Sequence, residues 1–371
     1  MVGSIAERAI ARGELSVFSL RAPKPNHTMK LFELREIGND ENFNPSNLCN
    51  DVPFTQASFY GDWQKSLGRT VRRFLVYSNK EIVAYFQLIK YPLLFGKSYF
   101  YIPYGPVIKD FLEDFFANLK QELKRISKTE NIVFVRLDFT PPVPSDTLSK
   151  FFTKAPFYTY HSAYFQPRVE WFLDLEKTEN ELLMAMHKKT RYSIRLAERK
   201  EIIAEIVTDN FEKYFEIFYE LMEGTAKRNG FSLHPKDYYK NIFQTLSKIE
   251  NAYLSVAKYK DKILCVYLVV IYGGVANYLY GGSSAEERNR MPTYLAHWKA
   301  IVHAKQLHCN SYNFGGIEEE SHLLNKGMIT LTSYKKKFGG QEVTHADFFD
   351  VVINPFWYHL YNFRKRLKKI V

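Results

Sequence analysis

The sequence predicts an α+β protein built from two halves that share one order of elements. In both halves, runs of strand length rich in Tyr, Phe, Val and Ile alternate with longer helix-like segments, and short polar turns join neighbouring strands. A proline-rich segment, "TPPVPSD" at 140–146, lies between the two repeats of this order. We therefore expect mixed sheets flanked by helices, with the boundary between the halves near 140–168.

The first half is expected to begin after a disordered lead. Residues 1–28 end in "RAPKPNHT", and Met29 opens the first strand-like run, so that Met29 competes with Met1 as the start of the natural protein. The apolar runs predict strands at 30–36, 72–78, 81–92, 98–107 and 132–139. The helical segments of this half are expected at 55–68 and 110–128.

The second half repeats the scheme with a strongly basic helix near its start. Its strands are expected at 169–175, 205–209, 252–260, 262–273, 275–284 and 311–317. Its helices are expected at 186–200, 210–229, 235–248 and 291–308. The repetition of strands, hairpins and helices indicates a duplicated α+β unit.

The chain ends in a segment that has both apolar and basic residues at helical spacing. Five basic residues lie in "FRKRLKKI" at 363–370, and the apolar ones are Phe356, Leu360, Phe363, Leu367 and Ile370. One interpretation is a helix that packs its apolar stripe on the body of the protein and leaves its basic side in water. The other is a basic face that contacts anionic lipid or RNA, and both can hold together.

Charge and cysteine content narrow the class of protein. The net charge of +11 favours phosphate-bearing partners: nucleic acid, nucleotide-sugars or an anionic membrane face. The three cysteines form no C-x-x-C and no Cys/His group at zinc spacing, so we expect a reduced, cytoplasmic protein without a metal site. No secretory signal is recognised, and the longest apolar runs are shorter than the roughly 20 residues that span a bilayer.

The basic helix, "MHKKTRYSIRLAERK" at 186–200, carries six basic residues and one acid. Lys188, Arg191, Arg195 and Arg199 follow one another at steps of three and four residues, so they share one face of a helix. The opposite face is expected to carry Leu183, Met186, Thr190, Ile194 and Ala197. Like charges at this spacing repel, which indicates either an anion site or a solvated helix face with a few ion pairs.

Four sequence blocks resemble, in order, those of the FemABX family of aminoacyl-tRNA-dependent peptidoglycan peptidyltransferases. The blocks are "YIPYGPVI" (101–108), "QPRVEWFLDLEKTENELLMAMHKKTRYSIRLAERK" (166–200), "YGGSSAEERNRMPTYLAHWKAIVHAKQLHCNSYNFGGI" (280–317) and "YKKKFGGQEV" (334–343). The resemblance implies two tandem GNAT-like acyltransferase domains, at 29–165 and 166–340, with 341–371 completing the first. The short connection between 229 and 252 is similar to that of compact members without a helical arm.

The resemblance also implies an activity. Members of the family move an amino acid from aminoacyl-tRNA onto an amine of the peptidoglycan precursor. The aminoacyl-tRNA is a co-substrate, and no cofactor is expected. The precursor is either UDP-MurNAc-pentapeptide or its lipid-linked form, and the enzyme works in the cytoplasm or peripherally at the inner membrane face. The sequence determines neither the amino acid nor the acceptor form.

Site residues follow from the same blocks. Lys188, Arg191, Arg195 and Arg199 would hold the pyrophosphate of the precursor, because arginine offers forked donors to adjacent anions. Lys335, with Lys336 next, would meet the acceptor end of the tRNA and stabilise the oxyanion; without the resemblance these lysines would be exposed at a hairpin turn before "FGG". Tyr280 and Tyr334 are further candidates for substrate contacts.

Some alternatives stay open at this point. Tyr104 stands where the family usually has Arg, which puts a phosphate contact at that position in question. Asp138, Glu318, Glu319 and Tyr280 are conceivable proton acceptors, and no general base is assigned. Three functions compete with this one: a related transferase acting on an exopolysaccharide or lipid, an acyl-CoA-dependent N-acetyltransferase, and a non-catalytic tRNA- or membrane-binding protein. The sequence lacks the pyrophosphate-binding loop that is typical of acetyltransferases.

Overall fold

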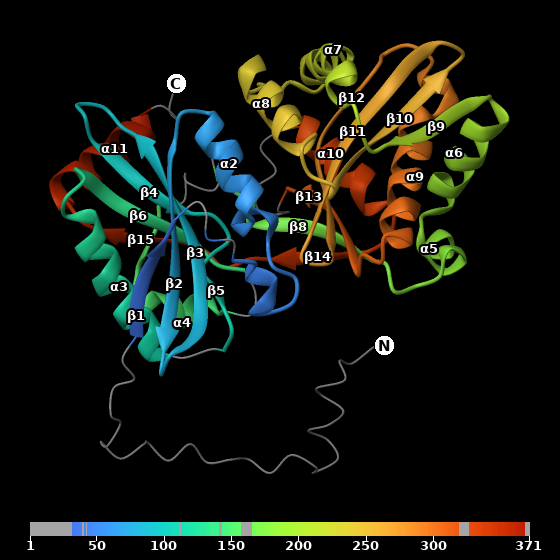
Figure 1. The fold of residues 1–371 in the computed structure, drawn as a ribbon. Coiled ribbons are helices and arrows are strands. Elements are labelled where there is room, and N and C mark those ends of the chain that lie inside the picture. Colours follow the sequence, from blue (N-terminus) through green and yellow to red (C-terminus); the bar gives the residue numbers. More distant parts are fainter. Residues whose placement is uncertain are drawn as a thin grey trace, which may run out of the picture. The chain divides into compact units, whose positions relative to one another are not determined.

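The computed structural model describes residues 32–38, 41, 43–110, 113–140, 143–156, 165–318 and 326–367 (Figure 1). Residues 32–371 form one compact unit, and its strands form two sheets. The expected lead at 1–28 and the two alternative starts lie outside the described residues. The predicted fold class, mixed sheets flanked by helices, is confirmed.

The first sheet contains eight strands. Their order is β1 (Phe32–Ile37), β2 (Thr70–Ser78), β3 (Glu81–Pro92), β4 (Ser98–Ile102), β6 (Ile132–Asp138), β15 (Phe348–Val352) and β7 (Thr153–Lys154), with β5 (Val107–Ile108) beside β3. Among the described strands of this sheet, only β4 and β6 pair in parallel. The helices of this half are α2 (Ser58–Ser66), α3 (Glu113–Ser127), α4 (Ser145–Ser149) and α11 (Pro355–Leu367), and short 3-10 turns cover Pro45–Asn47 and Phe54–Gln56.

The period of two along each strand decides which helices cover which face of the first sheet. Phe134 on β6 packs in a cluster with residues of α2 and α11, whereas the next residue, Val135, packs in a cluster with residues of α3. The aromatic cluster on the α2 side continues into the second half, where the rings of Trp63 and Tyr238 lie 5.0 Å apart. The two halves therefore share part of one core.

The second sheet contains seven strands. Their order is β14 (Gln341–Thr344), β8 (Val169–Asp174), β13 (Ser311–Gly316), β12 (Val275–Ser283), β11 (Lys262–Tyr272), β10 (Ala252–Tyr259) and β9 (Ile202–Val207). Again one pair, β12 and β13, is parallel. One face packs against α7 (Glu212–Asn229) and α8 (Lys236–Leu246). The other packs against α5 (Glu179–Ala185), α6 (Lys188–Arg199), α9 (Pro292–Gln306) and the end of α10 (Lys326–Lys336).

The structure corrects one helix boundary in the second half and adds one helix. The basic helix begins at Lys188, not at 186, because the His187 side chain accepts a hydrogen bond from the Lys189 N–H and caps the helix. Leu183 and Met186 therefore lie outside α6, while Thr190, Ile194 and Ala197 are buried on it as expected. A helix at 326–336 was not predicted, and it places Lys335 in a last helical turn instead of a hairpin.

The C-terminal segment, expected to complete the first half over 341–371, is divided between the sheets. Strand β14 pairs with β8 of the second sheet, and β15 then pairs with β6 of the first. A buried ion pair fixes β15, because Arg136 donates from Nε and Nη2 to the two oxygens of Asp350 at 2.8 and 2.7 Å.

The expectation that the final helix packs its stripe of leucines and phenylalanines on the body is wrong. Phe356, Leu360, Phe363 and Leu367 are exposed, and Ile370 lies outside the described residues. The packed face of α11 is aromatic and polar instead: the Tyr358 hydroxyl donates to Asp350 at 2.7 Å. This face can be buried because the Tyr358 hydroxyl has a hydrogen-bond partner in Asp350.

Candidate functional site

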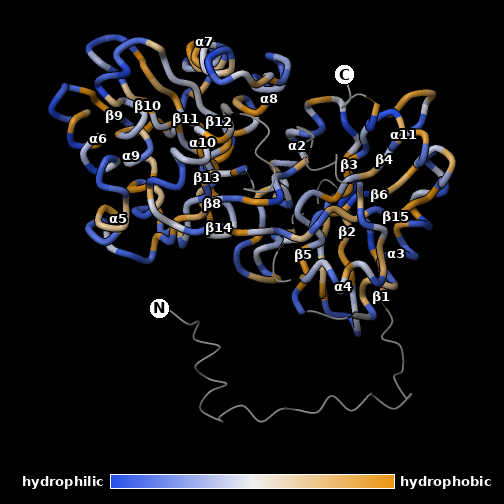
Figure 2. The backbone as a smooth tube through the Cα atoms, turned by 180° about the vertical axis from the view of Figure 1, so that it is seen from behind, coloured by the Kyte–Doolittle hydropathy of each residue, from blue (hydrophilic) through white to orange (hydrophobic). Residues whose placement is uncertain are grey.

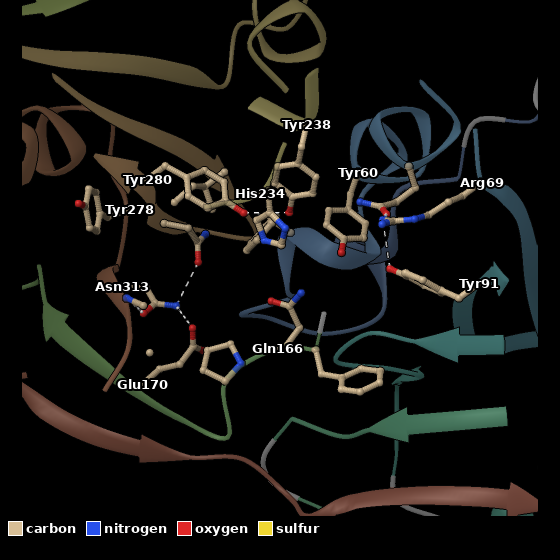
Figure 3. Close-up of a pocket in the computed structure, with 18 residues that line it drawn as sticks. Tyr60, Arg69, Tyr91, Gln166, Glu170, His234, Tyr238, Tyr278, Tyr280 and Asn313 are labelled. Carbon is tan, nitrogen blue, oxygen red and sulfur yellow. Dashed lines mark hydrogen bonds between the residues drawn. The ribbon is translucent and has the colours of Figure 1, made fainter. Parts of the chain in front are cut away.

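The candidate site is a cavity at the point where β12 and β13 separate. The two strands pair only at Val275–Asn277 and Ser311–Asn313, and the β11–β12 register shifts near Leu279. Beyond this pairing, residues of both strands line an open space of about 260 Å³ (Figure 3). Both halves line the cavity, with Phe54, Tyr60, Gln64, Arg69, Tyr91, Phe165, Gln166, Pro167, Glu170, His234, Tyr238, Asn277, Tyr278, Leu279, Tyr280, Asn313, Gly315 and Gly316.

A cation lies at one end of the cavity. The Arg69 guanidinium lies over the Tyr91 ring, 4.4 Å from its centroid, and donates to the Tyr91 hydroxyl at 3.3 Å and to Gln64 Oε1. Within the described part of the chain, Arg69 forms no ion pair with a carboxylate. Its charge is therefore available to an anionic ligand.

A buried carboxylate lies at the other end. Glu170 Oε1 accepts a hydrogen bond from Asn313 Nδ2 at 3.0 Å, and Glu170 Oε2 lies 2.8 Å from His345 Nε2. Asn313 Nδ2 also reaches Asn277 Oδ1 at 3.3 Å (Figure 3). Because each carboxylate oxygen has a second lone pair, this network holds Glu170 in place without exhausting its capacity to accept.

Aromatic rings form the wall between these ends. The hydroxyls of Tyr280 and Tyr238 are 3.0 Å apart, and the His234 ring stacks on Tyr238 at 4.1 Å (Figure 3). Burial, and then the nearby Arg69, lower the pKa of His234 below its usual value, so its ring is neutral at pH 7. Tyr280 is one predicted site residue that the structure places in the cavity.

Lys335 lies directly behind the cavity wall. Its Nζ donates to the Gly316 carbonyl at 2.6 Å and lies 3.9 Å from the position that a Cβ atom would take on Gly315. The side chain is only 5% exposed, and burial lowers the pKa of Lys335 to about 8, against the opposing attraction of Glu170. Lys335 is thus a buried cation beside the cavity, and the alternative of an exposed lysine at a hairpin turn is wrong.

Glycine makes this close packing possible after α10. Gly340 has φ +98°, and a Cβ atom there would overlap the Phe172 carbonyl oxygen of β8. The backbone can therefore turn directly from α10 into β14, which holds Lys335 against β13.

The other two predicted residues of this block lie outside the cavity lining. The Tyr334 hydroxyl donates to the Thr293 carbonyl at 3.0 Å, and its ring packs on Tyr294 and Phe338. Lys336 is partly exposed, with Nζ 3.8 Å from Glu342 and 5.2 Å from the centroid of the Trp171 ring. Their substrate roles stay predictions.

The basic stripe of α6 also contributes no residue to the cavity. Lys188, Arg195 and Arg199 are exposed and form no ion pair with another described residue. Arg191 differs, because its Nη1 donates to the carbonyls of Met184 at 3.1 Å and Met186 at 2.5 Å, and so caps α5. The assignment of the stripe to a pyrophosphate stays a prediction, with three exposed cations to carry it.

Tyr104 and Asp138 have structural roles next to the site. The Tyr104 hydroxyl donates to the Pro167 carbonyl at 2.5 Å, and its ring lies 4.4 Å from that of His345, so it supports two residues of the cavity wall and network. Asp138 accepts from the Tyr101 hydroxyl and the Tyr104 N–H, each at 2.5 Å. Neither Asp138 nor Glu318 lines the cavity, and Glu319 lies outside the described residues.

Asp138 gives a testable pH dependence of stability. Burial raises its pKa from 3.8 to about 7, so between these values the folded protein holds a proton that the unfolded chain has lost. Stability from this group is complete below about pH 4 and is lost as pH rises through 7, by about 4 kcal/mol. We expect urea unfolding at pH 5 and pH 8 to show the part of this loss that falls above pH 5, about 2–3 kcal/mol, in the wild type and not in Asp138→Asn, which mimics the protonated form. Parallel pH curves would contradict the assignment.

Arg69, Glu170, Gln166 and His234 were missed from the sequence. Glu170 alone had a signal there, an acid within the apolar strand "VEWFLDL". Within the part of the chain that is described, no group of three or more His, Cys, Asp or Glu side chains could hold a metal ion. In the same part of the chain, the helices are too short or too polar to cross a membrane.

Comparison with known sequences identifies related proteins. The FemAB family model matches residues 152–265 and 246–366. Lipid II:glycine glycyltransferase of Staphylococcus aureus strain MRSA252 is 22% identical over 405 residues, 88% of this chain and 94% of that protein. The protein of the same name from Staphylococcus saprophyticus is 24% identical over 268 residues, which cover 56% of this chain and 64% of that protein.

Solved structures agree with this likeness at the level of fold. The crystal structure of FemX has a TM-score of 0.76 at 22% identity and covers 88% of this chain and 99% of that one. A tandem GNAT protein from the clavulanic acid biosynthesis pathway has a TM-score of 0.52 at 10% identity, with the same coverage. The expectation of two tandem acyltransferase folds is confirmed.

Proposed function

We propose, from the premise that this chain belongs to the FemAB family of transferases, that it moves an amino acid from aminoacyl-tRNA onto an amine of a peptidoglycan precursor. Family membership and the identification as a transferase confirm the prediction from the sequence blocks. The donor and the acceptor are the proposed part. The observation that carries them is the cavity with Arg69 at one end, Glu170 at the other and the buried Lys335 behind its wall.

The two ends of the cavity fit the two substrates of an ester aminolysis. Glu170 and Asn313 can accept hydrogen bonds from the attacking amine and orient its lone pair. Arg69 can hold a carboxylate or phosphate of the substrate that carries the amine or the ester. The reaction is downhill, so positioning the two groups is the main task of the protein.

Lys335 supplies positive charge where the reaction develops negative charge. The tetrahedral intermediate carries an oxyanion, and a cation in a poorly solvated place stabilises it more strongly than one in water. Below pH 8 Lys335 is mainly protonated and is held against the Gly316 carbonyl, from which it can shift to the substrate oxygen. We assign no general base.

The acceptor is proposed to be the lipid-linked precursor. The relatives that match most of this chain are named for Lipid II, and the chain carries net charge +11, which suits an anionic surface. We place the enzyme in the cytoplasm, at the inner face of the membrane where such an acceptor lies.

The α6 stripe gives a test of phosphate binding. Arg195 is exposed on α6, without an ion pair to any described side chain. If it binds the precursor pyrophosphate, Arg195→Ala should raise the KM for the precursor roughly tenfold, the effect of one charge-assisted hydrogen bond, and leave the KM for aminoacyl-tRNA unchanged. Glu198→Ala, a substitution of an exposed acid on the same helix, is the matched control. A raised KM for aminoacyl-tRNA alone would reassign the stripe to the tRNA.

Mass spectrometry tests the proposed reaction. The purified protein is incubated with tRNA, synthetases, the twenty amino acids and either UDP-MurNAc-pentapeptide or the lipid-linked precursor in detergent, with a parallel reaction containing acetyl-CoA. We expect the precursor to gain the mass of an amino-acid residue, and ribonuclease treatment to abolish the gain. An acetyl adduct instead would identify an acetyltransferase, and no gain on either precursor would refute the proposal.

A further inference from the structure

We infer that the exposed side of α11, together with the tip of the β3–β4 hairpin, docks this protein on an anionic lipid bilayer. This inference extends the proposed function and rests on one part of it, the proposal that the acceptor is linked to a lipid. We call this surface the α11 surface; its residues are Leu94, Phe95, Lys97, Phe356, His359, Leu360, Phe363, Arg364, Arg366 and Leu367.

The helix carries its apolar residues on the side opposite its packed face. Phe356, Leu360, Phe363 and Leu367 follow at steps of four, three and four residues, so they form one stripe, and they are 71%, 43%, 61% and 48% exposed. Figure 2 marks the hydrophobic residues along α11. A contiguous exposed apolar stripe of this kind indicates an interaction site.

The packed face of α11 does not depend on this stripe. The Tyr358 hydroxyl donates to Asp350, and the rings of Tyr358 and Tyr361 lie 5.4 and 5.1 Å from that of Phe134 on β6. The helix is therefore held to the sheet by one side and leaves the other without a described partner within the chain.

A second element extends the apolar stripe. Leu94 and Phe95, at the tip of the β3–β4 hairpin, are 53% and 76% exposed. The Phe95 ring lies 5.8 Å from that of Trp357, and Phe356 lies 5.8 Å from Trp357 as well. Two elements that are far apart in the sequence thus present aromatic side chains at the same place.

Charge selects the partner. His359, Arg364 and Arg366 are exposed on both flanks of the stripe, and Lys97 lies 5.5 Å over the Trp357 ring. No Asp or Glu occurs from 355 to 371, where the sequence has three further Lys. Apolar residues flanked by cations suit the boundary between acyl chains and anionic headgroups. A second copy of the chain would bring like charges together. RNA bases can stack on phenylalanines, but RNA offers no apolar phase for the exposed leucines of the same stripe, Leu360 and Leu367.

Vesicle co-sedimentation of the full chain tests the inference. The vesicles contain phosphatidylglycerol and phosphatidylcholine, or phosphatidylcholine alone, and no precursor. We expect binding to the anionic vesicles that weakens with salt, and a loss of at least tenfold in Phe356→Ser/Phe363→Ser and in Arg364→Glu/Arg366→Glu. Met184→Ser, which removes a 65% exposed apolar side chain on α5, is the matched control and should bind like the wild type.

The outcomes separate this inference from the proposed function. Wild-type protein that stays in solution with anionic vesicles, or a Phe356→Ser/Phe363→Ser variant that binds them fully, would overturn the inference. Two other results would also overturn the inference. In both, the wild type fails to bind vesicles and either self-associates in light scattering or shifts tRNA in a gel, and the Phe356→Ser/Phe363→Ser variant loses that association. On the lipid-linked precursor in detergent, where no bilayer is present, this variant should keep the wild-type rate. Vesicle binding by a wild-type protein that transfers no amino acid to either precursor would refute the proposed function and leave the α11 surface standing.

Discussion

Lys335→Met is expected to lower kcat by about 10²–10³ while binding of the precursor is nearly unchanged. The substitution keeps the length of a buried side chain and removes the cation that stabilises the oxyanion. Single-turnover rates measured beside precursor binding by calorimetry would separate the two effects. Lys336→Met tests the second predicted lysine, which is partly exposed: little change in kcat would leave the role with Lys335, and an equal loss would move it to Lys336.

The pH dependence of kcat/KM distinguishes a cation from a base at this position. Because burial lowers the pKa of Lys335 to about 8, the protonated fraction falls as pH rises through 8. We expect a falling limb there in the wild type and its disappearance in Lys335→Arg, whose guanidinium stays charged. A limb that rises with pH and depends on Lys335 would instead make it a proton acceptor, and an unchanged kcat in Lys335→Met would remove it from the mechanism.

Asp350→Ala is expected to destabilise the fold by about 3–5 kcal/mol. The Arg136 guanidinium is fully buried, and without Asp350 its charge would have no counterion. Tyr358 would lose its acceptor at the same time, which loosens α11 from the sheet. Urea unfolding followed by circular dichroism measures the change.

The matched control removes both charges. Arg136→Met/Asp350→Leu leaves no buried ion, so we expect it to be clearly more stable than Asp350→Ala. Equal stability of the two variants would mean that the lost packing, and not the unpaired charge, sets the cost.

Most of the strands were predictable because each is a short run rich in aromatic and β-branched side chains. The predicted strand at 81–92 coincides with β3. The predicted strands at 72–78 and 132–139 differ from β2 and β6 by at most two residues at one end. Local sequence predicts such elements because each is a short apolar run bounded by turn residues. The helix at 326–336 was missed because its sequence, "KGMITLTSYKK", has only a weak apolar face.

The candidate site was predictable only in part. Tyr280 and Lys335 were reached through the resemblance of their blocks, and the structure places both at the cavity. Arg69 and His234 come from loops next to α2 and α8, and no motif near them predicts a ligand. Arg69 meets the second half where α2 packs on α8 through Trp63 and Tyr238.

The sequence by itself determined the fold class, the family and the net positive charge, since these follow from periodicity, ordered blocks and composition. Only the tertiary structure decided which side chains face each other and which face water. Lys335 is buried because Gly340 lets the chain turn against β8, and the apolar stripe of α11 is exposed because Tyr358 and Asp350 hold the opposite face of the helix. Both outcomes depend on contacts between residues remote in sequence, which helical spacing alone does not encode.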